Sequence, residues 1–146
     1  MKTTDLHQHI GTTLTTTEWR RISQADIDAF GQATGDTQWI HTDPERAKHS
    51  PLGTTIAHGL LLVSWLPMLL QEALVLEDAK YSLNYGYDKI RFVQPVPVGS
   101  RVRLVAQLIG VEGEEQGYKI YIGCTVELEG SEKPACVAES IAMVIV

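Results

Sequence analysis

An aspartate and a histidine five positions apart, Asp36 and His41, are the residues whose types best suit chemistry near neutral pH. A carboxylate and an imidazole can hold one water molecule and move protons on and off it, which is general acid–base chemistry. Their spacing alone does not bring them together. Asp36 can equally be a turn residue after Gly35, and His41 a partly buried histidine that is bonded to the backbone.

A second candidate is the segment Ala57-His58-Gly59, which opens the most apolar stretch of the chain. Backbone N–H groups at the amino end of a helix point along its positive dipole, and a glycine lets a ligand oxygen come close. Such amides can stabilise an oxyanion that develops on a carbonyl group. Gly59 can equally serve only to let the helix pack closely against a sheet.

Other catalytic or metal-binding arrangements have weaker support in the sequence. His41, His49 and His58, taken with an aspartate, match no compact metal-ligand spacing, so we expect no metal site. Ser50 or Ser64 could act as the nucleophile of a triad, but neither lies in the strand–turn–helix motif that presents such a serine.

The first helix that must position these residues has clear start and stop signals. Ser23 suits the N-cap, and Asp26 lies in the capping-box position three residues later. Ile22 and Ile27 are placed to form a hydrophobic staple across the helix start. Gly35 suits the residue after the last turn, so we expect a helix over 24–34 that delivers Asp36 at a defined place.

Two further helices follow in the sequence. Asp43 and Pro44 predict an N-cap and first helical residue of a short helix, which the segment 50–53 ends. A longer helix is expected from about Ile56 to Leu74. It is apolar nearly all round, as expected of a helix that other structure surrounds.

From Tyr81 onward the apolar period changes from helical to two, which is typical of half-buried strands. We expect four consecutive antiparallel strands within 81–92, 102–108, 118–128 and 136–146. A polar, glycine-rich turn over 110–117 should separate the second and third. The threonine-rich segment 14–19 is also strand-like, and His7 and His9 before it could bind metal on a strand, although a solvated tail is the stronger expectation.

Composition and charge exclude several broad classes. The 146 residues suffice for one domain with a sizeable core, so we treat 1–146 as one domain. A net charge of −6 with scattered basic residues argues against a nucleic-acid partner. We expect no signal peptide, membrane span or membrane partner and a cytoplasmic location. Cys124 and Cys136 are expected as buried free thiols, with a disulfide between neighbouring strands as the alternative.

Two long motifs resemble the MaoC-like family, which includes the (R)-specific enoyl-CoA hydratases. The first motif is Gly35-Asp36-Thr-Gln-Trp-Ile-His41-Thr-Asp43-Pro-Glu-Arg-Ala47, followed by Gly53-Thr-Thr-Ile-Ala-His58-Gly59. The second is Asn84-Tyr85-Gly86, Lys89-Ile-Arg91-Phe92 and Pro95-Val-Pro-Val-Gly99, which is similar to the nodulation-protein-N-like branch of single hot-dog domains. The resemblance covers roughly 22–105.

The resemblance implies an α+β hot-dog fold, in which a five-stranded antiparallel sheet wraps the long helix and a loop and helix segment overhangs it. It also implies a homodimer, commonly with the sheets joined edge to edge. By position, Asp36 and His41 match the family's catalytic pair, and Gly59 matches the glycine whose N–H binds the thioester oxygen. The substrate-binding residues that we expect are Gln38, Trp39, His58 and Ser64. Gln38-Trp39 replaces the family's more usual Asn-Pro.

The function that follows as an expectation is reversible hydration of trans-2-enoyl-CoA to (3R)-hydroxyacyl-CoA, a lyase reaction of fatty acid metabolism. It needs no metal or redox cofactor, because CoA is simply the carrier of the acyl-CoA substrate. One alternative is an acyl-CoA thioesterase of the same fold, which would release free thiol. Another is a non-catalytic acyl-thioester-binding module. The presence of both Asp36 and His41 favours the enzyme.

Overall fold

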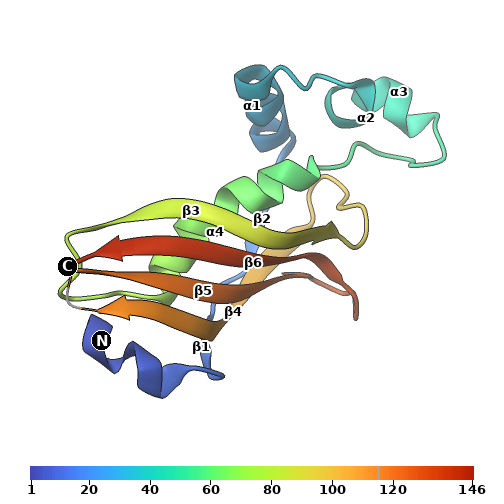
Figure 1. Cartoon of the computed structure of the whole chain (residues 1–146). Helices are drawn as coiled ribbons and strands as arrows, with labels where there is room; N and C mark the ends of the chain where they lie inside the picture. Colours follow the sequence, from blue (N-terminus) through green and yellow to red (C-terminus); the bar gives the residue numbers. More distant parts are fainter. Residues whose placement is uncertain (115) are drawn as a thin grey trace.

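A long helix, α4 (Gly59–Ala73), lies against one face of a curved antiparallel sheet, and this pair forms the centre of the fold (Figure 1). The computed structural model describes residues 1–114 and 116–146. Within them the strand order is β1-β4-β5-β6-β3, and a short strand, β2, also pairs with β4. This is the α+β hot-dog arrangement that the resemblance implies, with one short strand beyond the expected five.

The strands are close to the expected ranges but longer at one hairpin. Their bounds are β1 (Thr13–Thr16), β2 (Arg20–Arg21), β3 (Tyr81–Phe92), β4 (Arg101–Glu114), β5 (Gly117–Leu128) and β6 (Pro134–Ile145). Strands β4 and β5 remain paired out to Glu114 and Gly117, so they occupy most of the segment where a turn was expected. Residue 115, which was expected in that turn, lies outside the described residues.

The core forms where the inward faces of β4, β5 and β6 meet α4. Alternate residues of β5 are buried from Tyr118 to Val126, as the period of two predicts. They share one apolar cluster with Leu62, Leu66 and Leu69 of α4. Both cysteines are buried free thiols in this part of the sheet, which confirms that expectation.

Helix α1 (Gln24–Thr34) begins and ends as its sequence predicts. The Ser23 hydroxyl accepts from the Asp26 N–H at 3.1 Å, and the Asp26 carboxylate accepts from the Ser23 N–H at 2.9 Å, so the capping box is complete. Gly35 ends the helix with φ of +81°, a left-handed conformation that costs glycine little. The chain therefore turns sharply just before Asp36.

One helix begins later than the sequence predicts, and one short helix was not expected. Helix α4 begins at Gly59 rather than near Ile56, because Ile56 and Ala57 are extended and donate backbone hydrogen bonds to Ile40 and Val96. A short helix, α2 (Trp39–Thr42), forms where only a loop was expected. The predicted short helix α3 (Pro44–Lys48) is present, with the Asp43 side chain accepting from the N–H of Arg46.

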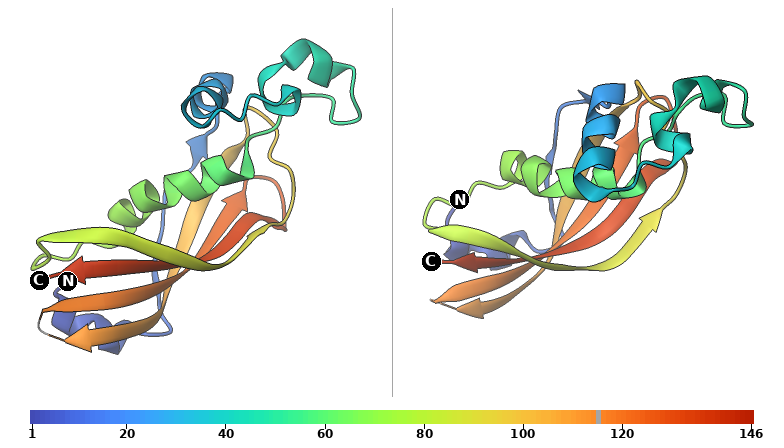
Figure 2. Two further views of the ribbon diagram at one scale, coloured as in Figure 1. Left: turned by 45° about the horizontal axis from the view of Figure 1, so that its top comes forward. Right: turned by 90° about the horizontal axis from the view of Figure 1, so that it is seen from above.

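Helices α1, α2 and α3 form a lobe that projects beyond the amino end of α4 and away from the sheet (Figure 2). At the opposite end of the molecule a 3₁₀-helix, η1 (Thr3–His9), packs with Leu6 fully buried. The amino terminus donates to Val75 at 3.1 Å. The segment around His7 and His9 is therefore an anchored helix and not the expected tail, although His7 is exposed to solvent as expected.

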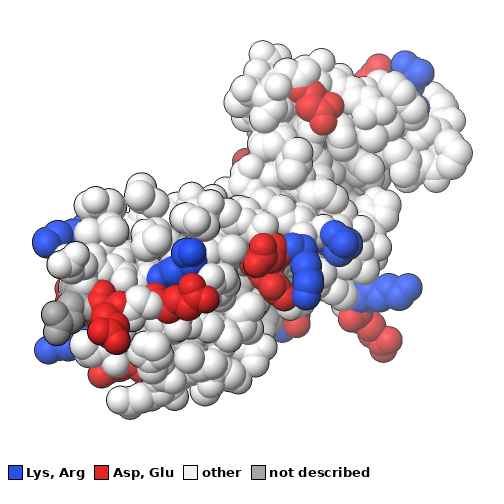
Figure 3. Space-filling model, viewed as in Figure 1, with Lys and Arg blue, Asp and Glu red and all other residues white. Residues whose placement is uncertain are grey.

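Charged side chains of both signs are interspersed along the face of the sheet shown in Figure 3. Ion pairs also join β4 to residues in and just after β5, as between Arg103 and Glu127 at 2.6 Å and between Arg101 and Glu129 at 3.2 Å. On that face there is no continuous basic stripe of the kind that binds a phosphate backbone. In the described part of the chain, no helix has the length and apolar character needed to cross a membrane.

Candidate active site

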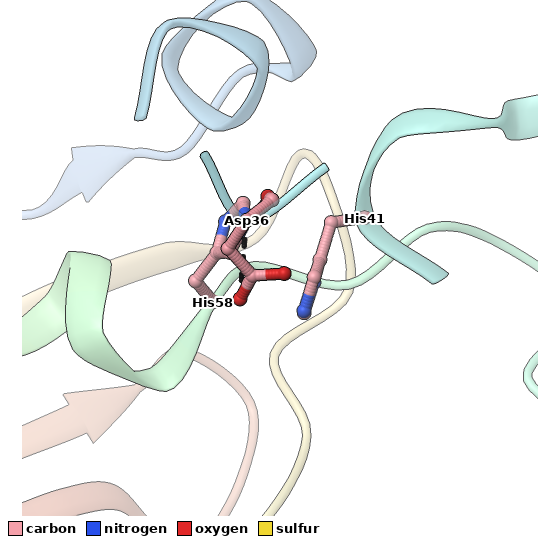
Figure 4. A group of neighbouring side chains, drawn as sticks. All are labelled: Asp36, His41 and His58. Carbon is pink, nitrogen blue, oxygen red and sulfur yellow. Dashed lines mark hydrogen bonds and ion pairs between the residues drawn. The ribbon is translucent and has the colours of Figure 1, made fainter. Parts of the chain in front are cut away.

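Asp36, His41 and His58 meet between the overhanging lobe and the amino end of α4 (Figure 4). One nitrogen of each histidine and one carboxylate oxygen of Asp36 all lie within 4.8 Å of one another. Both histidine rings are buried, with 7% of His41 and 2% of His58 exposed, whereas 52% of the Asp36 side chain is exposed. The cluster therefore has an open side, and the Asp36 carboxylate lies on it.

The backbone of Asp36 is held close to helix α1. Its carbonyl oxygen lies 3.0 Å from the position that a Cβ atom would take on Gly31. A larger residue at this position would therefore push the carbonyl away. Gly35, in its left-handed conformation, turns the chain so that Asp36 can fold back over the helix.

His41 is oriented by two backbone contacts. Its Nδ1 atom lies 2.7 Å from the carbonyl oxygen of Ile56, which can only accept, so Nδ1 carries a hydrogen. Its own carbonyl oxygen accepts from the side-chain amide of Gln24 at 2.8 Å. In the neutral ring Nε2 then holds a lone pair and can accept a proton.

The spacing of Asp36 and His41 suits the capture of one water molecule. A carboxylate oxygen of Asp36 and one ring nitrogen of His41 lie within 4.8 Å of each other. Two hydrogen-bond acceptors at up to that separation can each accept a hydrogen bond of about 2.8 Å from the same water. A water held in this way directs its own lone pair away from both acceptors. Such an arrangement can activate water for addition to an electrophilic carbon.

Gly59 is the first residue of α4, and two features distinguish it. A Cβ atom on this residue would lie 2.7–2.8 Å from three carbons of the Phe92 ring, so the close packing of α4 on β3 requires glycine. Among the hydrogen bonds of the described residues, none is donated by the N–H of Gly59, and no side chain caps this helix. The packing role is thus present in the structure, and the N–H is available at the positive end of a 15-residue helix.

His58 lies directly before Gly59 and faces the lobe. Its Nε2 atom lies 2.8 Å from the carbonyl oxygen of Asp36 and 3.9 Å from a carboxylate oxygen of the same residue. Its ring stacks on His41 with centroids 3.8 Å apart. A metal ion fits this trio poorly, because one His58 nitrogen already binds a carbonyl and the other is buried.

The other expected substrate-binding residues lie near the cluster without joining it. Gln38 is exposed, and its backbone carbonyl accepts from the N–H of His41. The Trp39 ring lies under the Arg46 guanidinium at 4.4 Å. Ser64 is exposed on α4 and donates to the carbonyl of Leu60 one turn earlier.

Two positioning residues were not found from the sequence. Gln24 joins three elements, since it bonds to His41 and also accepts from the buried Thr55 hydroxyl at 2.5 Å. Gly31 provides the space for the Asp36 carbonyl. A glycine inside a capped helix was the available signal for Gly31, because such a glycine costs helix stability without a compensating role. A glutamine at the first helical position gives no comparable signal.

An apolar groove of about 380 Å³ lies along the carboxyl-terminal half of α4. Its apolar lining includes Pro67, Leu70, Leu74, Leu83, Ile120 and Val144. Polar side chains also line it, among them Gln71, Asn84, Tyr87 and Ser140. Burial raises the pKa of Tyr87 above its usual value. From Gly59 to Pro67 the helix advances about 12 Å, so the groove begins about that far along α4 from the cluster.

Comparisons with known proteins agree with this architecture. The model of a family described as MaoC like domain matches residues 5–127. The 3-hydroxyacyl-thioester dehydratase Z of Mycobacterium tuberculosis is 49% identical over 138 residues, which cover 94% of this chain and 91% of the relative. The nodulation protein N of Rhizobium leguminosarum is 38% identical over 145 residues, which cover 96% and 89%.

Two solved structures share the fold. A monoamine oxidase regulatory protein from Archaeoglobus superposes with a TM-score of 0.79 at 27% identity, over 93% of this chain and 90% of that one. An (R)-hydratase from A. caviae superposes with a TM-score of 0.75 at 22% identity, over 91% and 94%. At that identity the second likeness concerns the fold alone.

Proposed function

The chain belongs to the MaoC-like domain family, and from that premise we propose that it hydrates trans-2-enoyl-CoA reversibly to (3R)-hydroxyacyl-CoA. The observation that carries the proposal is that a carboxylate oxygen of Asp36 and a ring nitrogen of His41 lie within 4.8 Å of each other, in a cluster whose third member, His58, precedes a helix N–H that donates no hydrogen bond within the described residues. The 3-hydroxyacyl-thioester dehydratase relative supports the reaction class, because dehydration is the reverse of hydration. The (R) configuration is taken from the resemblance of the two sequence motifs.

In the proposed reaction a water molecule donates one hydrogen bond to the Asp36 carboxylate and the other to Nε2 of His41. Its oxygen attacks C3 of the enoyl group, and one O–H bond breaks as the pair takes up the proton. The π electrons of the C2–C3 bond move toward the thioester oxygen. A proton from the pair is then delivered to C2, so that the elements of water are added and the enzyme returns to its starting state.

The negative charge that develops on the thioester oxygen needs a donor in place beforehand. The N–H of Gly59 fits this role, because it has no partner in the described chain and lies at the positive end of α4. One such donor contributes typically about 2.7–4 kcal/mol to lowering the barrier. No metal or redox group enters these steps.

We place the acyl chain of the substrate along α4. The exposed face of α4 at Leu60 and Ser64 leads from Gly59 toward the apolar groove, which suits the hydrocarbon tail.

Strand β3 is an edge strand whose exposed apolar residues are Tyr81, Leu83, Tyr85 and Phe92. An unprotected apolar edge of this length favours pairing with a second copy of the chain.

Hydration of crotonyl-CoA, followed by loss of the ultraviolet absorbance of the conjugated thioester, tests the proposal. We expect Asp36→Asn and His41→Gln each to lower kcat/KM at least about 100-fold, because each removes an acid–base group. His49→Gln is the matched control, since His49 is exposed at the end of α3 and outside the cluster. Chiral analysis of the product checks the (R) configuration.

Near wild-type turnover in both cluster variants would refute the role of the pair. Release of free thiol without hydration would identify a thioesterase instead. Binding of crotonyl-CoA with neither change would identify a non-catalytic module. A series of enoyl-CoA substrates of increasing length would then report on the groove.

A further inference from the structure

We propose that His58 is a further positioning residue of this site, and that one buried imidazole holds both Asp36 and His41 in place without contacting the substrate. The inference rests on the proposed function, because it gives a role to a third residue of the same cluster. It replaces the expected substrate contact of His58, since only 2% of the residue is exposed. The argument depends on three contacts of the ring.

The first contact fixes the backbone of Asp36. Nε2 of His58 lies 2.8 Å from the Asp36 carbonyl oxygen, which only accepts hydrogen bonds, so Nε2 must donate. The same carbonyl oxygen also lies close to Gly31, where a Cβ atom would be 3.0 Å away. The backbone of Asp36 is therefore held by a donor and by its close approach to α1, and this fixes the point from which its carboxylate projects.

The second and third contacts fix the ring of His41. The two imidazoles stack with centroids 3.8 Å apart and an interplanar angle of 22°. The Phe30 ring of α1 also packs on His58, at 4.8 Å and 58°. The His41 ring thus packs against the His58 ring, which itself packs against α1. The hydrogen bond from Nδ1 of His41 to the Ile56 carbonyl then fixes the rotation of the His41 ring.

The unpartnered nitrogen of His58 indicates that packing alone does not explain the residue. Within residues 1–114 and 116–146, Nδ1 of His58 is the one buried side-chain nitrogen or oxygen without a hydrogen-bond partner. Burying such an atom is unfavourable, and an apolar ring would fill the same space without it. What an apolar ring lacks is the donor on Nε2, and this donor reaches Asp36.

Two substitutions of His58 separate the donor from the ring. The side-chain amide of glutamine can place its nitrogen where Nε2 lies, whereas asparagine reaches only the position of Nδ1. Both variants lose the stacking on His41, so they should lose similar thermal stability. We expect His58→Asn to lower kcat for crotonyl-CoA by about tenfold to 100-fold with KM changed less than about twofold, and His58→Gln to recover most of that loss.

Gly31→Ala provides an independent displacement of the same carbonyl. Its added Cβ atom must push the Asp36 carbonyl by a few tenths of an ångström, while alanine favours the helix. We expect kcat to fall several-fold with no loss of thermal stability. Full activity in both Gly31→Ala and His58→Asn, or equal activity of the asparagine and glutamine variants, would overturn the positioning role.

A measurement without turnover keeps the inference separate from the proposed reaction. In ¹⁵N spectra of the labelled wild-type protein, we expect His58 as the Nε2–H tautomer and His41 as the Nδ1–H tautomer. If the wild type fails to hydrate crotonyl-CoA but shows these tautomers, the proposed function fails and the positioning contact stands. Finding His58 as the Nδ1–H tautomer would refute the contact even in an active enzyme.

Discussion

Adding one carbon to Gly59 tests how the close packing of α4 on β3 supports the site. The Cβ atom of alanine would lie 2.7 Å from the nearest carbon of the Phe92 ring, and ordinary contacts begin at 3.4 Å. Either the ring or the start of the helix must therefore move by about 0.7 Å. Phe92 is 50% exposed, so its ring has room to yield partly toward solvent.

We expect Gly59→Ala to lower the free energy of unfolding by about 1–3 kcal/mol, the usual cost of overpacking. Because movement of the helix start displaces the N–H proposed to bind the thioester oxygen, kcat should also fall, by up to about 100-fold to 1,000-fold if the donor is lost. Urea denaturation measures the first effect, and crotonyl-CoA hydration measures the second.

A double-mutant cycle with Phe92→Ala shows whether the clash is the cause. Truncation at position 92 removes all three ring carbons that the new Cβ atom would meet, so Gly59→Ala should cost at least about 1 kcal/mol less in that background. Activity should recover in parallel, because Gly59→Ala keeps the backbone N–H of residue 59. Equal costs of Gly59→Ala in both backgrounds would refute the reasoning, and so would a Gly59→Ala variant with unchanged stability and turnover.

Three further predictions concern the rest of the chain. Ser23→Ala should lower the free energy of unfolding by about 1 kcal/mol through loss of the capping box, and urea denaturation with no change would contradict it. Wild-type protein should have twice the 16.1 kDa chain mass by light scattering, and Leu83→Lys on the exposed edge of β3 should yield the single-chain mass; a monomeric wild type would contradict the dimer. Burial raises the pKa of Cys124 from 9.0 to about 12, so the folded state holds a proton that the unfolded state releases, and stability should fall as pH rises above about 9. Cys124→Ala should show a shallower fall in pH-dependent unfolding curves, and an identical slope would contradict the assignment.

Local signals in the sequence predicted the elements well. The capping box at Ser23 and Asp26 and the glycine at position 35 depend on atoms within a few residues of one another, so they act wherever the chain lies. The alternation of buried residues in β5 is likewise a property of the strand itself. Errors appeared where distant segments compete for the backbone, as at Ile56, whose N–H bonds to Ile40 instead of beginning the helix.

The sequence by itself identified the residues to which we assign the proposed chemistry: the types and order of Asp36, His41 and Gly59 are written in the first of the two long motifs. Only the tertiary structure decided how these residues meet. Gln24 and His58 act across gaps of 17 and 22 positions, and hydrogen bonds of that kind depend on how α1, α2 and α4 pack together. No local pattern records such packing, because hydrogen bonds and close contacts between elements arise only when the chain has folded.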